Sequence, residues 1–421
     1  MKATFSYAVR YKVNAHCLTP LRTSDAEGSA ENVLRCGDGR YMIQGSSIAG
    51  ALRSWAEENE DAELVKSLFG TQNKSGSLVI SDGIFSEEAQ LVLRPRLRID
   101  GRTGSASKSG KFDLAHIGRE AKFILTICWL GEKDKLSRTA AIERILAALH
   151  NGEILLGAEK SNGFGRISLE VKKQSYDMTK AEDRERWLAE VEDGETILLP
   201  QLVNGSMTVL TLRGTADSLL VKAAAARHEN SGSVTPSMTE AGLPVIPGSS
   251  IKGAVRARAE MIAEYMNLPD AFLEKLFGRE AREGDNGQAG LLRFEDAVLT
   301  EGFAQKITRI RINRFTGSVM RGGLFAEEPV GGVLSLNIAV PAEEKAGCML
   351  LFYALRDLAL GLYNLGSGGA IGRGFLRAEE LTAVTPDGQK LTLHVDCEKK
   401  CEISDPGNLL SIWQTALEAK Q

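Results

Sequence analysis

Two pairs of repeated segments in this 421-residue chain carry residue types that suit the binding of phosphate groups. In the first pair, residues 42–53 and 245–256, a short apolar segment runs into a glycine, two serines and a run of helix formers. This pattern places the serines at a helix N-cap and predicts a strand-to-helix turn. Backbone N–H groups are free at such a helix start, and together with the helix dipole they favour an anion. The serines are Ser46, Ser47, Ser249 and Ser250, and the basic residues that follow them are Arg53, Lys252 and Arg256.

The second pair of segments is basic and is interrupted by glycine and serine. Residues 98–105 and 311–318 align without gaps, and Asp100 is the only acid between residues 94 and 111. Because the whole chain has a net charge of −4, this positive charge is concentrated locally. One charged hairpin alone is compatible with a solvated surface, but its repetition favours two projecting loops that contact a polyphosphate. The cations in and around these segments include Arg98, Arg102, Arg309, Arg311 and Arg314.

A long polar loop, residues 18–40, precedes the first serine turn. Its acids are Asp25, Glu27, Glu31 and Asp38. The small residues around Asp25 predict an exposed, bent loop. In the second copy, Asp217 stands at the same distance from the end of its strand as Asp25, although the apolar residues 219–221 that follow it favour a structural role.

The elements that position these segments are predicted in the same order in both copies: a strand, a helix, a strand, the basic insertion, a strand, a helix, a glycine-rich turn and a last strand. The first copy gives residues 4–16, 48–59, 77–85, 122–129 and 138–150, and the second gives 207–213, 251–266, 290–299, 333–340 and 348–364. The order βαββαβ is that of an α+β, ferredoxin-like arrangement, which RRM-like RNA-binding sheets also use.

The glycine-rich turns, residues 157–166 and 366–375, contain Lys160, Arg166 and Arg373. Their glycines follow a helix and precede a strand, which is the reverse of the order in nucleotide-binding folds. Close approach of the backbone to a ligand and simple tight-turn geometry both explain them. We expect two domains at residues 1–173 and 205–385, a charged helical linker at 174–204, and an extension at 386–421 that ends in an amphipathic helix.

Composition excludes several classes of protein. The six cysteines form no CxxC pair, so free thiols are expected. The N-terminus lacks the pattern of a signal peptide and no apolar stretch is long enough to span a bilayer, which predicts a cytoplasmic protein without membrane contact. Nothing matches a nucleophile elbow, a P-loop or a metal-ligand set, so no organic cofactor and no small-molecule metabolic activity are expected.

Three segments of the second copy, residues 246–256, 311–328 and 371–375, together resemble the RAMP superfamily, in particular the repeated backbone subunit of type III CRISPR effectors. The first copy carries the same order with substitutions, among them Gln44 in place of the proline and Ala49 in place of the lysine. The resemblance covers nearly the whole chain. As two fused backbone domains, the chain is similar to the tandem backbone proteins of type III-D systems. It implies two tandem RAMP domains, each with a projecting basic insertion called a thumb.

The resemblance implies a CRISPR RNA (crRNA), a complementary target RNA and other effector subunits as partners. The serine turns and the basic residues would contact crRNA, and each thumb would push between guide and target. The expected RNA contacts are Ser46, Ser47, Arg53, Arg98, Arg102, Lys160, Arg166, Ser249, Ser250, Lys252, Arg256, Arg309, Arg311, Arg314 and Arg373.

In the family that the chain resembles, an aspartate between the first strand and the first helix promotes cleavage of the target RNA with Mg²⁺ or another divalent cation. The ribose 2'-OH attacks its own phosphate and leaves a 2',3'-cyclic phosphate. We map this role, and contact with the cation, to Asp25, with Asp38 and Glu31 as alternatives and Asp217 as a second site.

Two other functions remain open. The same scaffold without catalysis would hold the guide for partner subunits that cut. A guide-processing RNase would use a histidine as general acid and base, but the five histidines form no cluster in the sequence.

Overall fold

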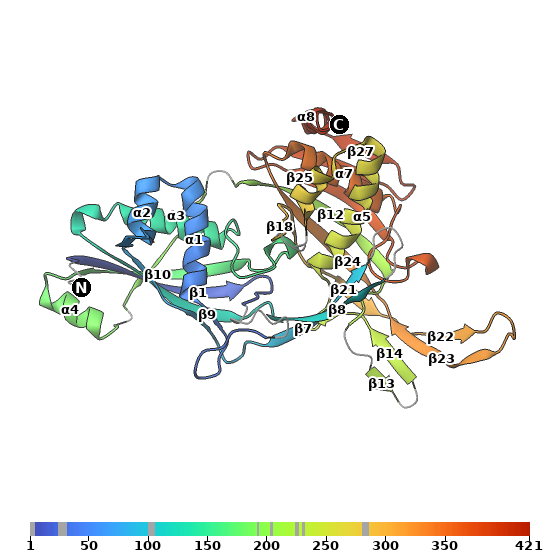
Figure 1. Ribbon diagram of the computed structural model, residues 1–421, viewed down its shortest axis with the longest axis horizontal. Helices are drawn as coiled ribbons and strands as arrows, with labels where there is room; N and C mark the ends of the chain where they lie inside the picture. Colours follow the sequence, from blue (N-terminus) through green and yellow to red (C-terminus); the bar gives the residue numbers. More distant parts are fainter. Residues whose placement is uncertain are drawn as a thin grey trace. The chain divides into compact units, whose positions relative to one another are not determined.

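The computed structural model describes residues 5–23, 32–99, 106–191, 193–202, 205–223, 227–229, 232–279 and 286–421. Contacts divide the chain into two units (Figure 1). Unit 1 comprises Met1–Val92, Ala115–Lys160 and Phe164–Val203, and unit 2 comprises Leu93–Leu114, Ser161–Gly163 and Asn204–Gln421. Each unit is described by itself.

Unit 1 is built on a sheet whose centre is β1 (Tyr7–Cys17). Antiparallel partners flank β1 on both sides: β9 (Lys122–Gly131) and β10 (Ile167–Asp177). The outer strands are β5 (Leu78–Ile80) and β6 (Gly83–Phe85) beside β9, β2 (Met42–Ile43) beside β6, and β11 (Glu195–Ile197) beside β10.

Helices cover one face of this sheet: α1 (Gly45–Asn59), α2 (Ala62–Phe69) and α3 (Arg138–His150) (Figure 1). The alternation of β1 explains why, because Val9, Tyr11 and Val13 are buried while the residues between them are partly exposed. In α1 the buried residues Ile48 and Leu52 recur every fourth position, which gives the helix one apolar side.

The interval 174–204, expected as a linker, is folded onto unit 1. It contains α4 (Ala181–Leu188), which its helix-prone charged residues predict, and β11, which adds a strand to the sheet. The guanidinium of Arg10 lies 4.1 Å from the centre of the Trp187 ring and holds α4 against β1.

Unit 2 repeats the plan around β12 (Met207–Leu219), which lies between β24 (Val330–Pro341) and β25 (Leu376–Val384). The other strands of this sheet are β26 (Lys390–Val395), β27 (Cys401–Ser404), β19 (Arg293–Phe294) and β21 (Thr300–Ala304). The helices are α5 (Gly248–Met266), α6 (Asp270–Phe277), α7 (Lys345–Ala359) and α8 (Leu409–Glu418). In both units, therefore, the first strand of the copy lies between the two strands that flank its second long helix.

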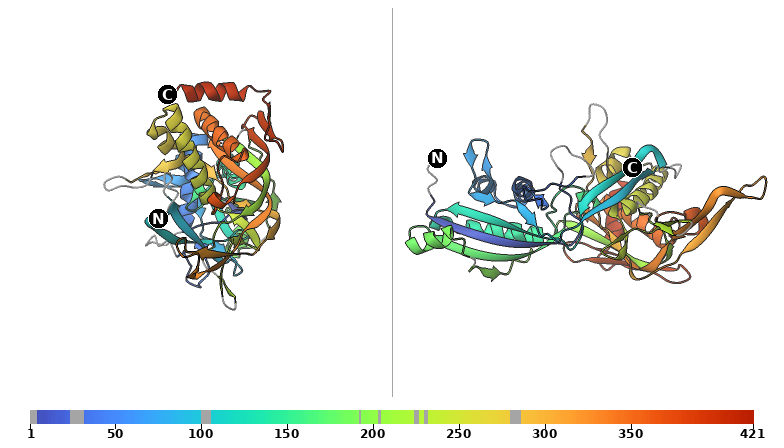
Figure 2. Two further views of the ribbon diagram at one scale, coloured as in Figure 1. Left: turned by 90° about the vertical axis from the view of Figure 1, so that its right-hand side faces the viewer. Right: turned by 90° about the horizontal axis from the view of Figure 1, so that it is seen from below.

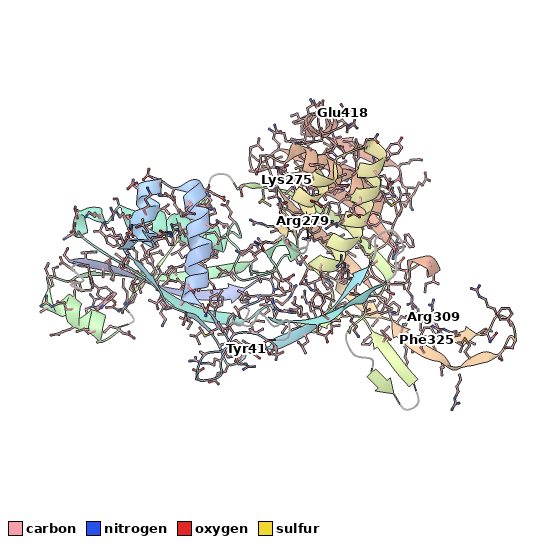
Figure 3. All side chains as sticks on the ribbon, in the orientation of Figure 1. Tyr41, Lys275, Arg279, Arg309, Phe325 and Glu418 are labelled. Carbon is pink, nitrogen blue, oxygen red and sulfur yellow. The ribbon has the colours of Figure 1, made fainter. Side chains whose placement is uncertain are left out.

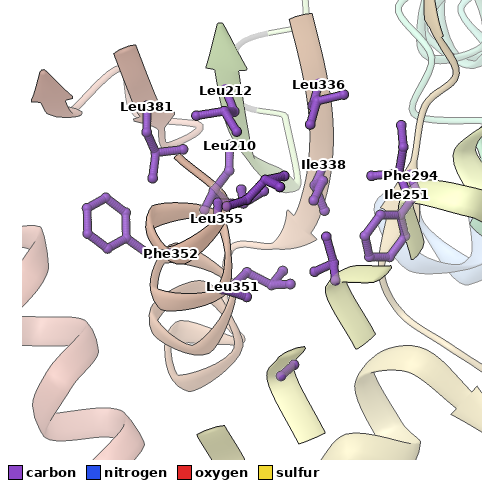
Figure 4. Packing of buried hydrophobic residues seen from close by; sticks show 14 of the residues in the cluster. Leu210, Leu212, Ile251, Phe294, Leu336, Ile338, Leu351, Phe352, Leu355 and Leu381 are labelled. Carbon is purple, nitrogen blue, oxygen red and sulfur yellow. The ribbon is translucent and has the colours of Figure 1, made fainter. Parts of the chain in front are cut away.

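The core of unit 2 lies between its sheet and α7. Figure 4 shows Leu351 and Leu355 of α7 facing Leu210 of β12 and Ile338 of β24. The predicted C-terminal amphipathic helix is α8, and it buries Trp413 and Leu417. The mixed α+β architecture expected from the sequence is confirmed.

Two hairpins correspond to the basic insertions. Residues 93–114 of the first hairpin belong to unit 2, and so does the whole of the second hairpin. The first hairpin is β7 (Leu91–Ile99) with β8 (Ala106–Ile117), and the second is β22 (Ile307–Ile312) with β23 (Val319–Glu328). β13 (Arg227–Glu229) and β14 (Gly232–Pro236) extend the second hairpin into a four-stranded sheet. Figure 2 shows the second hairpin as a long ribbon that extends from the body of unit 2.

Shorter elements complete the chain. They are β3 (Gly70–Thr71), β4 (Lys74–Ser75), β15 (Thr239–Glu240), β16 (Leu243–Ile246), β17 (Gly278–Arg279), β18 (Gln288–Ala289), β20 (Ala297–Val298) and the 3₁₀ turns at Lys133–Lys135, Lys160–Asn162 and Gly369–Ile371. Among the described residues, no helix is long and apolar enough to cross a lipid bilayer.

Candidate nucleic-acid interface

The two serine turns begin helices three residues earlier than the sequence predicts. α1 starts at Gly45 after an extended Gln44, and α5 starts at Gly248 after Pro247. No side chain of the N-cap residue closes either helix. The prediction that the serine pairs are N-caps is therefore wrong: Ser46, Ser47, Ser249 and Ser250 lie inside the first helical turn.

An aspartate from a later loop takes the first helical N–H group in both copies. The Gly45 amide donates to Asp82 Oδ1 at 2.7 Å, and the Gly248 amide donates to Asp296 Oδ1 at 2.7 Å. A negative charge there is favourable because the N-terminal end of the helix dipole is positive. Each helix start therefore already binds a carboxylate. The predicted phosphate contacts are then limited to the serines, of which Ser46 and Ser47 are exposed and Ser249 and Ser250 are half-buried.

Glycine is required at both helix starts because another backbone passes close by. A Cβ atom at Gly45 would lie 2.5 Å from the carbonyl oxygen of Ile80, and one at Gly248 would lie 2.1 Å from that of Phe294. The glycine therefore recurs in both copies because a side chain at this position would overlap the neighbouring backbone.

A groove of about 360 Å³ runs beside α1 in unit 1. On one side it is lined by the small residues of the helix, Ser47, Gly50, Ala51 and Ser54; facing them are Gly157, Ala158 and the exposed Lys160 of the glycine-rich turn. The groove therefore brings together two of the predicted RNA contacts, Ser47 and Lys160. Small side chains leave room for a polymer backbone to approach the helix.

Within the predicted acidic loop of residues 18–40, Thr23 and Leu34 line this groove on either side of Asp25 and Glu31 in the sequence. The Ala158 amide donates to the Arg22 carbonyl at 3.0 Å, and the Met42 amide donates to the Leu34 carbonyl at 3.0 Å. Asp25 and Glu31, the candidate catalytic and metal-binding acids, lie outside the described residues.

Asp38, the other candidate acid, closes a tight turn. Its carboxylate accepts hydrogen bonds from the Arg40 side chain at 2.8 Å and from the Cys36 thiol at 2.7 Å. Hydrogen bonding to Arg40 and then to Cys36 holds the pKa of this carboxyl well below its usual range. Such a carboxylate is a weak base, and its geometry suits a structural turn.

Asp217 does not occupy a loop. It lies within β12, is exposed, and forms an ion pair with Arg377 of β25. The glycines after the helices correct its assignment: Ala158 follows Gly157 and donates to Arg22, whereas Ser367 follows Gly366 and donates to Leu220. Arg22 therefore corresponds to Leu220, and the counterpart of the Asp25 loop begins after Val221. The sequence alignment of Asp217 with Asp25 is wrong.

The helix arginines have equivalent partners in the two copies. Arg53 pairs with Glu57 at 2.8 Å, and Arg256 pairs with Glu260 at 2.7 Å, each one turn further along the helix. Arg256 also donates to the Gly278 carbonyl at 3.1 Å. Both side chains are exposed enough to exchange these surface partners for phosphate, because exposed ion pairs contribute about 0–1 kcal/mol.

The arginines of the glycine-rich turns are not equivalent to each other. Arg373 is 4% exposed and pairs with Glu327 of β23 at 2.6 Å, so the prediction that it contacts RNA does not fit its position. Arg166 is half-buried, with its side chain against Gly152. Lys252 of α5 donates to the Ser161 hydroxyl at 3.3 Å.

A buried ionic cluster, which the sequence did not reveal, fixes the first hairpin. Arg94 of β7 is 3% exposed; it donates to Asp296 Oδ2 at 2.6 Å and forms an ion pair with Glu240. Asp296 therefore joins the start of α5 to the first hairpin. In the sequence, the cluster was indicated only by an aspartate that recurs after the first helix of each copy, Asp82 and Asp296. The pairing of Arg94 with Asp296 spans 202 positions and so leaves no local pattern.

The tip of the second hairpin is an exposed basic surface of unit 2. Asn313 Oδ1 accepts from the Phe315 amide at 2.9 Å and shapes the turn, which leaves the Phe315 ring fully exposed. Arg311 and Arg314 are exposed and form no ion pair with any described residue. Figure 3 shows Arg309 and Phe325 on the two strands of this hairpin, and Arg309 lies 3.8 Å from Glu327. In the first hairpin Arg98 is exposed, and Arg102 lies outside the described residues.

Within the described part of the chain, no group of three His, Cys, Asp or Glu residues is arranged to hold a metal ion. A model of the RAMP superfamily matches residues 14–168 and 234–377, which is more than half of the chain and falls in both copies. No curated protein matches the chain.

Proposed function

Since the chain belongs to the RAMP superfamily, we propose that it is an RNA-binding backbone subunit of a type III CRISPR ribonucleoprotein. Its two copies would bind crRNA and present it to a complementary target RNA, with other effector subunits as neighbours. The strand order of both sheets supports a ferredoxin-like domain in each copy, with the two hairpins as thumbs.

The observation that carries this proposal is the tip of the second hairpin. An aromatic ring that is 100% exposed stands beside two exposed arginines without described ion-pair partners. Single-stranded nucleic acids are bound by this combination, in which bases stack on the ring and cations track the backbone. The groove beside α1 adds a second surface with a lysine and open serines.

The test is to purify the protein and identify the nucleic acid that it retains. Arg311→Glu together with Arg314→Glu is expected to weaken RNA retention and flatten its dependence on salt, because fewer counterions are released. Phe315→Ala is expected to weaken binding by a factor that salt does not change. Lys399→Glu, on an exposed turn of unit 2 far along the sequence from either hairpin, is the matched control. Unchanged affinity in both hairpin variants would refute the proposal.

We further propose that the loop between Thr23 and Leu34 carries target-RNA cleavage, with Asp25 as the leading residue. In this reaction the ribose 2'-oxygen forms a bond to its own phosphorus while the bond from phosphorus to the 5'-oxygen breaks. The 2'-OH loses its proton to a base, and the leaving 5'-oxygen gains one, so the products are a 2',3'-cyclic phosphate and a 5'-OH.

Among the described residues, no group of acids, histidines or cysteines is arranged to hold a cation. Asp25 would contact the divalent cation that cleavage requires. Asp25→Ala is expected to retain guide and target but to lose cleavage, since a group that acts only in the transition state changes rate and not affinity. Glu31→Ala separates the two acids of the loop. Cleavage by wild type in Mg²⁺ but not in EDTA, blocked by a 2'-deoxy residue at the scissile position, would support this role.

A non-catalytic scaffold is the second candidate, and the ion pairs of Asp38 and Asp217 favour it at these two positions. If neither Asp25→Ala nor Glu31→Ala changes the cleavage of target RNA by the assembled complex, partner subunits cut and this chain binds.

A further inference from the structure

The carboxylate of Glu327, at the base of the second hairpin, is shared by three cations. Arg373 donates a hydrogen bond of 2.6 Å to Glu327 Oε2. Arg309 Nη1 lies 3.8 Å from the same oxygen, and Lys222 Nζ lies 3.9 Å from Oε1. These two distances are too long for hydrogen bonds, so Glu327 attracts both side chains without occupying their N–H donors.

The cluster is buried at its centre and exposed at its edge. The side chains of Arg373 and Glu327 are 5% and 10% exposed. Those of Arg309 and Lys222 are 33% and 52% exposed, and among the described residues neither forms an ion pair with a second acid. The opposite charges of the buried pair cancel each other. Arg309 and Lys222 therefore present two positive charges at the surface, where an anion can reach them.

The first copy shows that the fold does not need the buried ion pair. The gapless alignment of the basic insertions places Leu114 opposite Glu327. Equivalent backbone hydrogen bonds of the two glycine-rich turns place Phe164 opposite Arg373. Leu114 is 4% exposed and Phe164 is 1% exposed, so apolar side chains fill both positions. Replacing a buried ion pair by apolar residues is often neutral or stabilising, and stability alone does not explain why the second copy keeps the pair.

The cluster stands at the start of a basic face that runs toward the tip of the hairpin (Figure 3). Ile307 of β22 pairs with Glu327, so the two side chains share a face. Arg309 and Arg311 follow at every second position and lie on that face. Their Cα atoms are about 7 Å apart, from the rise of a strand. Cations repeated along one face suit a ligand that repeats its negative charge, and the phosphodiester backbone of RNA is such a ligand.

We propose that Lys222 and Arg309 together bind one phosphate group of an RNA strand at the base of the second hairpin, and that the buried pair of Arg373 and Glu327 positions them. This inference rests on the proposed RNA-binding function and adds to it a phosphate site with a buried ionic support that only the second copy has among the described residues. Arg373 and Glu327 are positioning residues, because they hold the two cations and do not meet the ligand themselves.

The first test measures the affinity for a single-stranded RNA between about 50 and 200 mM salt. Lys222→Gln and Arg309→Gln are each expected to weaken binding about 3-fold at the lowest salt, and the double variant about 10-fold. The double variant should also reduce the slope of log affinity against log salt concentration by about 0.7, the value for one phosphate contact of a single strand. Lys390→Gln, which removes an exposed charge on β26, is the control and should change neither quantity.

The second test asks whether the buried pair acts through Lys222. Glu327→Leu with Arg373→Phe gives the second copy the residues of the first and leaves the net charge unchanged. This variant is expected to keep its Tm within about 4 °C of wild type and to bind RNA about 3-fold more weakly. Adding Lys222→Gln to it should then change RNA affinity by less than about 2-fold, because Lys222 is no longer positioned. A full 3-fold loss on this addition would overturn the positioning role.

The surface variants test the phosphate contact even if the variant of the buried pair fails to fold. Wild-type affinity and slope in the double variant, or an equal loss in Lys390→Gln, would overturn this inference alone, since the variants at the hairpin tip test the proposed function separately. A double variant that loses only the binding of inorganic phosphate, measured by calorimetry, would overturn the assignment to an RNA strand. A wild-type protein that binds no RNA would overturn the proposed function with it.

Discussion

At the scale of single residues, the helix starts depend on one glycine and one aspartate each. The glycine admits a neighbouring carbonyl oxygen, and the aspartate accepts the first helical N–H group. Serine, one of the residue types that most often cap a helix, stands two positions too late in both copies to do so. The sequence thus predicts that a helix begins here but not what begins it, because the capping carboxylate lies 37 or 48 residues further along.

Gly45→Ala and Gly248→Ala are expected to lower the free energy of unfolding by about 1–3 kcal/mol each, because the added methyl group meets a backbone oxygen that cannot move aside. Urea titration of the purified variants measures this change. Gly253→Ala is the control: it lies on the exposed side of α5 with open space around it, so alanine there should stabilise by about 0.5–1 kcal/mol. A stabilised Gly248→Ala variant would contradict the packing described for the turn.

Asp82→Ala should have two opposite effects. Loss of the carboxylate at the start of α1 is expected to cost about 0.5–2 kcal/mol of stability. It also frees the Gly45 amide and removes a negative charge next to Ser46 and Ser47, so affinity for RNA should rise at low salt. Denaturant titration and a salt series of binding measurements separate the two. Weaker RNA binding at every salt concentration would show that no phosphate approaches this helix start.

At the scale of elements, the main strands and long helices follow from local pattern. Alternation in β1 and β12 and apolar residues every fourth position in α1 and α5 are visible in the sequence, and repetition of the order supports each assignment. The short helices α2 and α6 were missed, although Asp61 caps α2 by accepting from two amides. The packing of the first hairpin was also missed, because a contact between residues far apart in sequence leaves no periodic signal.

Arg94→Met is expected to destabilise unit 2 by about 3–5 kcal/mol, since it leaves the buried carboxylates of Glu240 and Asp296 without their cation. Replacing Glu240 by Gln and Asp296 by Asn in the same chain should recover most of this loss. Arg98→Met, on the same strand but exposed, is the control and should change stability by less than about 0.5 kcal/mol. Equal stability of the Arg94 and Arg98 variants would contradict a structural role for the cluster.

At the scale of the whole molecule, two separate hydrophobic cores predict two unfolding transitions in calorimetry. Unit membership, and not position in the sequence, should decide which transition a variant moves. Arg94→Met lies in the first sequence copy but should lower only the transition of unit 2, whereas Leu52→Ala in α1 should lower only that of unit 1. A single transition, or movement of the other transition by Arg94→Met, would show that the division of the chain is different.

The first hairpin lies early in the sequence but belongs to unit 2, and this affects the order of events during synthesis. Arg94 leaves the ribosome 202 residues before Asp296, which corresponds to about 10–40 s at ordinary rates of elongation. Until Asp296 is made, Arg94 of β7 lacks one of the two carboxylates that pair with it, although all residues of unit 1 have left the ribosome before then. Slower elongation between codons 115 and 296 would lengthen the exposure of this hairpin, and a chaperone or a nascent neighbouring chain that engages it would do so at that time.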